Sequence, residues 1–178
     1  DLHSFPTRRS SDLTGEDLRE YRKTVIDAVR RREWTSVAME HFGSDPRENL
    51  RLSLQRLREA DAVVVLVAHR YGTPVPLSAG GDGRHSYTWY EVVEAESLRK
   101  PVFGYVAPGN VRLELPRESD LLEDTTDADA RKALLDRIDL LRELKDKVRT
   151  RSAPPFTSPQ DLATGVLADV GRWEEEQA

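Results

Sequence analysis

The sequence predicts an α/β fold, a three-layer sandwich in which helices cover both faces of a mostly parallel sheet. Helical and strand patterns alternate along the chain, which is typical of βαβ units. The segment from Ala62 to Ala68 is apolar without a break, as expected of a central strand that is buried on both faces. Crossover connections between such strands are expected to be right-handed.

Composition limits the classes of protein to which the chain can belong. Its 178 residues suffice for one domain with its own core. The net charge of -5 makes nucleic acid an unfavourable ligand. The chain has no cysteine, which excludes disulfides and thiolate chemistry. No apolar run approaches the roughly 20 residues that cross a bilayer, and no signal peptide is visible, so we expect a cytoplasmic domain without membrane contact.

The first dozen residues differ from the rest of the chain. The start, DLHSFPTRRSSDL, has neither strand nor helix periodicity and lacks an initiator Met. It resembles the translation of a sequencing adapter. We therefore interpret residues 1–12 as a non-native or disordered leader, exclude them from the fold, and expect the first strand of the sheet to be missing or replaced. Residues 13–178 are then a single domain.

The first half of that domain is expected to hold two helices and two strands. Apolar side chains at helical spacing predict a helix over about 15–32. A short strand follows over 34–39. The segment SDPRENL, with Asp45 as N-cap, marks the start of a helix that runs to about residue 60. The apolar strand over 61–68 closes this half.

The second half continues the alternation. A long loop rich in Gly and Pro, 69–85, leads to Ser86, which is expected to cap a helix. A strand over 101–108 follows, and residues 109–127 are expected to form an irregular acidic connection.

The carboxyl-terminal part is expected to be mainly helical. An amphipathic pattern predicts a helix over about 128–148. The segment 149–156 is a weak candidate for an edge strand because of its prolines. Ser158 opens the last helix.

The loop after the apolar strand is the first place to expect a site, because open parallel sheets bind ligands beyond the carboxyl ends of their strands. The candidate ligand-binding residues on it and at its end are His69, Arg70, Tyr71, Gly72 and Ser86. Other interpretations stay open. His69 and Arg70 also fit the solvated end of a strand, Tyr71 fits core packing, and Gly72 fits a backbone turn.

Glu91 is the candidate for a catalytic carboxylate. It lies in the second turn of the helix that Ser86 begins, where a side chain can face the strand ends. Cleavage of a glycosidic bond through an oxocarbenium-like transition state uses such a carboxylate. The alternative is a solvated helix carboxylate, as expected for Glu94 and Glu96, and spacing alone favours it.

Neither a metal site nor a phosphate loop is predicted. The four histidines, among them His41 and His85, lack the spacing of metal ligands. The glycines of AGGDG, 79–83, do not match a phosphate-binding loop and fit a flexible loop better.

Three segments together carry a family resemblance: DLREYRKTVIDAV, DAVVVLVAHRYGTPVP and SYTWYEVVEAESLRKPVFGYV. They resemble the TIR-like family of uncharacterised domains numbered 4062, over about residues 13–170. The resemblance implies a flavodoxin/TIR-like sheet. The family's first strand and its Ser-Ser-Thr loop are absent, and Ser10-Ser11-Asp12 imitates that loop only within the leader.

The resemblance also implies a function. Such domains stand at the amino end of larger bacterial signalling or defence proteins that carry NTPase and repeat regions. The resemblance implies a non-catalytic module that acts by self-association or by binding a partner. The alternative is an NAD-cleaving effector in which Glu91 is the catalytic carboxylate, Arg70 meets a phosphate and Tyr71 stacks on a base or ribose. Binding of a nucleotide without cleavage is a third reading, so no cofactor is established and NAD or another nucleotide stays open.

Overall fold

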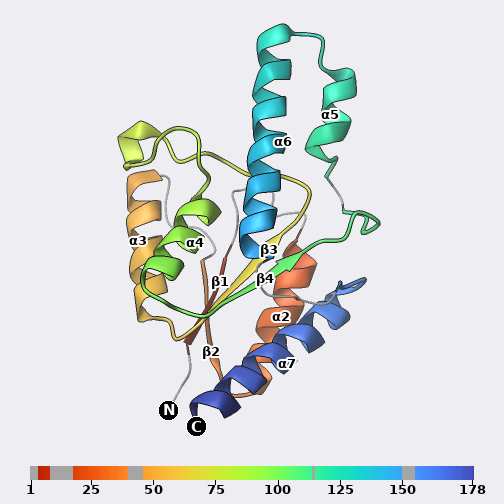
Figure 1. The fold of residues 1–178 in the computed structure, drawn as a ribbon. Helices are drawn as coiled ribbons and strands as arrows, with labels where there is room; N and C mark the ends of the chain where they lie inside the picture. The colour runs from red at the N-terminus through yellow and green to blue at the C-terminus, as the bar shows by residue number, and fades with distance from the viewer. Residues whose placement is uncertain (1–3, 9–17, 40–45, 114, 150–154) are drawn as a thin grey trace.

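Strands and helices alternate along the chain, as the sequence pattern predicts (Figure 1). The structure is a computed structural model that describes residues 4–8, 18–39, 46–113, 115–149 and 155–178. In chain order the elements are β1 (Ser4–Arg8), α2 (Arg19–Arg31), β2 (Thr35–Met39), α3 (Pro46–Glu59), β3 (Val63–Val67), the short 3-10 helix η1 (Leu77–Ala79), α4 (Tyr87–Ser97), β4 (Val102–Val106), α5 (Glu118–Asp124), α6 (Ala128–Val148) and α7 (Pro159–Gln177).

The strands form one parallel sheet of four in the order β2-β1-β3-β4. The backbone of β1 pairs with β2 along the whole of Ser4–Arg8. On its other side Thr7 and Arg8 pair with β3. Strands β3 and β4 pair in register from Val63 to Val67. The carboxyl ends of all four strands therefore meet at one edge of the sheet.

The exclusion of the leader from the fold was wrong for residues 4–8. These residues form β1, which lies between β2 and β3. A strand therefore stands in the first position, where we expected one to be missing or replaced. Sequence periodicity did not indicate it because strand formation depends strongly on the neighbours with which a segment pairs. The adapter origin of residues 1–12 stays a prediction.

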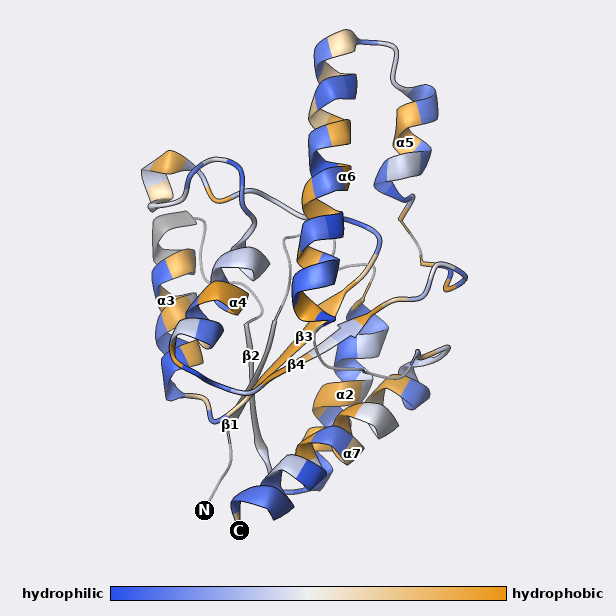
Figure 2. Ribbon diagram, viewed as in Figure 1, coloured by the Kyte–Doolittle hydropathy of each residue, from blue (hydrophilic) through white to orange (hydrophobic). Residues whose placement is uncertain are grey.

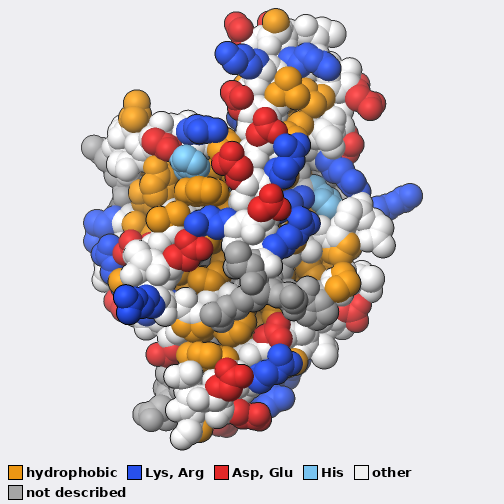
Figure 3. All heavy atoms as spheres, in the orientation of Figure 1, with side chains coloured by type: hydrophobic (Ala, Val, Ile, Leu, Met, Phe, Trp, Pro, Cys, Tyr) orange, Lys and Arg blue, Asp and Glu red, His pale blue; other side chains and the backbone are white. Residues whose placement is uncertain are grey.

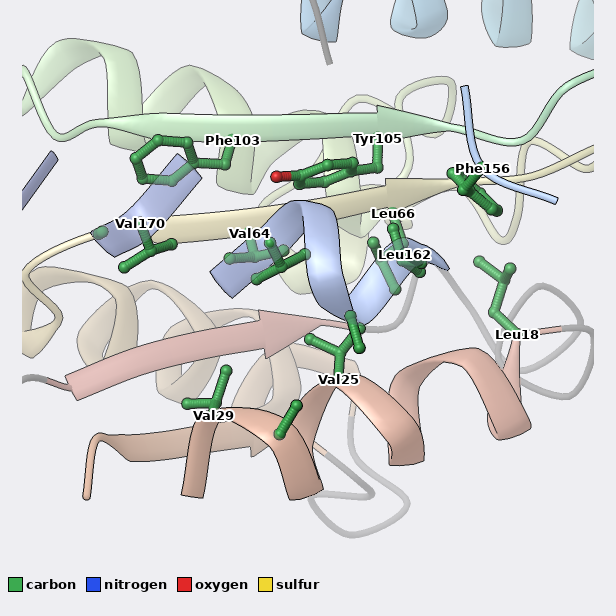
Figure 4. Packing of buried hydrophobic residues seen from close by; sticks show 14 of the residues in the cluster. Leu18, Val25, Val29, Val64, Leu66, Phe103, Tyr105, Phe156, Leu162 and Val170 are labelled. Carbon is green, nitrogen blue, oxygen red and sulfur yellow. The ribbon is translucent and has the colours of Figure 1, made fainter. Parts of the chain in front are cut away.

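Helices cover both faces of the sheet, which confirms the three-layer sandwich. Side chains alternate along β3, so that Val64 and Leu66 face one layer while Val63, Val65 and Val67 face the other. The first layer is α2 and α7, whose apolar side chains pack on β3 and β4 (Figure 4). The second holds α3, α4 and α6. Strand β3 is apolar along its whole length, as Figure 2 shows.

Most predicted boundaries hold, and one element was missed. Ser86 and Ser158 cap α4 and α7 as predicted. The connection 109–127 is not wholly irregular, because it contains the short helix α5. The N-cap Asp45 and most of the candidate edge strand at 149–156 lie outside the described residues. No helix among the described residues is long and apolar enough to span a membrane.

Candidate functional site

Tyr71 links the segment after β3 to α4 and α5 through two hydrogen bonds. Its side chain is fully buried and belongs to the core. Its phenol oxygen accepts the backbone N–H of Ser86 at 3.0 Å. Its own backbone N–H donates to Oε1 of Glu118 at 3.2 Å. Burial raises the pKa of Tyr71, so the phenol stays neutral at physiological pH. The structure thus places Tyr71 in the core, the second of the two interpretations that the sequence left open.

His69 and Arg70 are buried as well, and they are not the solvated end of a strand. His69 Nε2 lies 3.0 Å from the carbonyl oxygen of Val111. Because a carbonyl only accepts, this nitrogen carries the proton in that bond. Arg70 Nη1 donates to the carbonyl of Pro116 at 3.4 Å. Through these hydrogen bonds, both side chains hold the segment before α5 against the end of β3.

Gly72 and Ser86 shape the two ends of the loop. Gly72 has a φ of 95°, in the left-handed region that favours glycine. Ser86 is fully buried, and its Oγ accepts the backbone N–H of Trp89 at 3.4 Å as the N-cap of α4. These contacts give both residues a structural role.

Glu91 is buried on α4 and faces α3. Its side chain is 3% exposed, so the solvated alternative does not describe it. Its Oε1 accepts the hydroxyl of Ser53 on α3 at 3.2 Å. Glu94 one turn later does reach the surface region, where it pairs with Arg58 at 2.7 Å. Glu91 lines neither of the two cavities described next.

A cavity of 680 Å³ opens at the carboxyl ends of β3 and β4. Val106 at the end of β4 and the residues that follow it, 107–109, form its floor together with His69. The start of α5 and the second half of α6 form its walls. A smaller cavity of 380 Å³ shares His69 and Arg117 with it. Of the residues predicted as a site, His69 alone lines these two cavities.

The charged lining of the larger cavity was not predicted as a site. It comprises Arg117, Glu118, Arg142, Lys145 and Arg149. Arg142 and Lys145 on α6 and Arg149 at its C-cap follow the spacing i, i+3, i+7, which places them on one helix face. This basic stripe is a signal that the sequence contains. Its position over the strand ends could not be read from the sequence, because it depends on where α6 packs.

Burial and charge both act on the ionisable groups of this lining. Burial raises the pKa of Glu118, while the N–H of Tyr71 and the cations of Arg137, Arg70 and Lys145 oppose that rise. Burial lowers the pKa of Lys145, and the positive charges of Arg149 and Arg117 lower it further. Within the described residues, no group of three His, Asp or Glu side chains could hold a metal ion.

A family model described as "Domain of unknown function (DUF4062)" matches residues 13–171. The chain belongs to the DUF4062 family. This match confirms the resemblance that the three sequence segments carry. No curated protein matches the sequence.

Among solved structures, the DUF4062 domain is similar to the TIR domains in "Structure of the activated Roq1 resistosome directly recognizing the pathogen effector XopQ". The TM-score is 0.47 at 15% sequence identity, over 96% of this chain and 99% of that chain.

Proposed function

We propose that the DUF4062 domain is a signalling or interaction module that acts by self-association. The module would serve as the amino-terminal part of a larger sensor or defence protein, as the family resemblance implies. The observation that carries this proposal is the hairpin of α5 and α6. The first half of α6 extends beyond the sheet with α5 beside it (Figure 1).

The α5–α6 hairpin leaves apolar surface uncovered. Leu135 on α6 is 48% exposed. Leu121 and Leu122 on α5, with Leu134 and Ile138 on α6, are only half-buried. Hydrophobic side chains gather on this part of the surface in Figure 3. A projecting helix with an open apolar stripe gains stability when a second surface covers it.

The partner that covers this apolar surface is a second copy of the chain, because the charges of α6 suit contact with an identical surface. Charged residues of both signs follow one another along its outer half, in the segment ADARKALLDRID, 128–139. A surface with both signs can face its own copy about a two-fold axis without net repulsion. A partner of strongly acidic or basic character would match it less well.

Sedimentation velocity across a wide range of protein concentration tests this proposal. We expect the wild-type chain to associate as concentration rises. Leu135→Glu should weaken the association about tenfold or more, since an unpaired carboxylate would be buried in the interface. Leu98→Glu is the matched control, because Leu98 is 42% exposed but lies at the end of α4. A wild-type chain that stays monomeric throughout would contradict self-association.

Incubation of the same protein with NAD distinguishes a non-catalytic module from an NAD-cleaving effector. Cleavage would require Glu91 to leave its contact with Ser53 and reach the ribose of NAD. The proposed module releases no nicotinamide from NAD, either dilute or associated. Release of nicotinamide that Glu91→Gln abolishes would overturn the non-catalytic proposal in favour of the enzyme.

A further inference from the structure

The cavity at the carboxyl ends of β3 and β4 has the size of a small-molecule site. Its volume is 680 Å³, and such sites range from about 300 to 1,000 Å³. It also lies at the sheet edge where open parallel sheets bind ligands. Val106, Ile138 and Leu141 contribute an apolar wall. A ligand that fills this cavity therefore has an organic part to place against that wall.

Positive charge dominates the rest of the described lining. The cations are Arg117, Arg142, Lys145 and Arg149, against the single carboxylate of Glu118. Lysine and arginine side chains lie along the lower half of α6 in Figure 3, with aspartate and glutamate side chains between them. Arg142 pairs with Asp139 at 3.0 Å and Arg149 with Asp146 at 3.6 Å. These pairs are exposed and contribute little, so both arginines can turn to a stronger anion.

Lys145 gives the clearest sign of an anion site. The residue is half-buried in the cavity wall. Within the described residues its ammonium group makes no ion pair or hydrogen bond. Arg149 and Arg117 place positive charge near it, against the single carboxylate of Glu118. A cation that is partly desolvated beside other cations is unfavourable unless an anion compensates it.

We propose that this cavity binds an organic phosphate of the size of a nucleoside diphosphate. The phosphates lie against Lys145 and Arg117, and the organic part lies against Val106, Ile138 and Leu141. A guanidinium matches two phosphate oxygens at once, and an ammonium adds a point charge. Several cations exceed what one carboxylate would need, which favours a ligand with two or more negative charges. This ligand site lies on the inner half of α6, whereas self-association is proposed for the outer half around Leu135, and Ile138 lies where the two surfaces meet.

Isothermal titration calorimetry and thermal unfolding of the full chain with ADP test this inference. We expect ADP to bind and to raise the Tm, and added salt to weaken the binding. Lys145→Met keeps the aliphatic stem but removes the charge. It should weaken ADP binding about tenfold or more. It should also raise the Tm of the unliganded chain, because Lys145, Arg117 and Arg149 place three cations beside the single carboxylate of Glu118, and the variant removes one of them. A residue with a merely structural role would not combine these two effects.

Lys132→Met is the matched control. Lys132 lies on the same helix, is exposed and does not line the cavity, so ADP binding should not change. Pyrophosphate supplies the charge without the organic part and should bind more weakly than ADP. Failure of ADP to bind the wild-type chain overturns the proposal, and so does equal binding by Lys145→Met. Pyrophosphate that binds as tightly as ADP overturns the role of the apolar wall.

Discussion

The phenol oxygen of Tyr71 accepts the backbone N–H of Ser86 at 3.0 Å, and both residues are fully buried. Tyr71→Phe leaves this N–H without a partner in a place that water does not reach. An unsatisfied buried donor costs about 1–3 kcal/mol. We expect the variant to lose that much free energy of unfolding, measured by urea denaturation.

Tyr90→Phe is the control at the residue scale. The phenol oxygen of Tyr90 accepts the backbone N–H of Asp82 at 3.0 Å, but that bond is exposed. Water can replace it, so the loss should stay within about 0.5 kcal/mol. Equal losses in both variants would show that the contact of Tyr71 with Ser86 adds nothing beyond an exposed bond.

The site residues show how far single positions could be predicted. The sequence placed Tyr71 and Ser86 at the correct edge of the sheet, because the apolar strand and the cap of α4 are strong local signals. Core packing was among the interpretations of Tyr71, but its bond with Ser86 could not be predicted, since that contact joins residues 15 positions apart. The burial of Glu91 against Ser53 on α3 depends on helix packing in the same way.

At the scale of elements, the contact between β4 and α6 depends on a glycine. A Cβ added at Gly104 would lie 2.8 Å from Cβ of Val148 and still closer to the Val148 carbonyl oxygen. Gly104→Ala therefore forces the end of α6 away from the sheet. We expect a loss of about 1–3 kcal/mol in the free energy of unfolding, as for other overpacked cores. Chemical denaturation measures it.

A second glycine substitution separates crowding from backbone effects. Gly171 lies inside α7, and a Cβ added there meets nothing within 4 Å. Gly171→Ala should stabilise the chain by up to about 1 kcal/mol, because alanine favours a helix. A Gly104→Ala variant as stable as the wild type would mean that α6 can move from β4 without cost.

Helices were the elements most readily predicted, apart from α5. Long amphipathic patterns such as that of α6 span several turns, and caps mark their starts. The seven residues of α5 are too few to show such a pattern. Glu118 in its first turn accepts the N–H of Tyr71, so tertiary contacts hold this helix in place.

At the scale of the whole molecule, the sheet depends on the strand that sequence reasoning excluded. The backbone of β1 pairs with β2 on one side and β3 on the other. In the order β2-β1-β3-β4, β2 and β3 are not paired with each other, so β1 joins β2 to the rest of the sheet. Fold class could be predicted because the other elements carry strong periodicity. Which segments form the sheet could not be predicted, because the sequence of β1 has no strand periodicity.

Removal of residues 1–8 tests this dependence. The truncated chain would expose an edge of β3, whose five residues are all buried in the intact domain. An open apolar edge is a template for pairing between chains. We therefore expect light scattering to rise and the cooperative urea transition to be lost. Removal of residues 175–178, which are exposed at the end of α7, should change neither. If the chain without residues 1–8 keeps the wild-type transition, β1 is dispensable and the domain folds from residue 13, as sequence periodicity alone predicts.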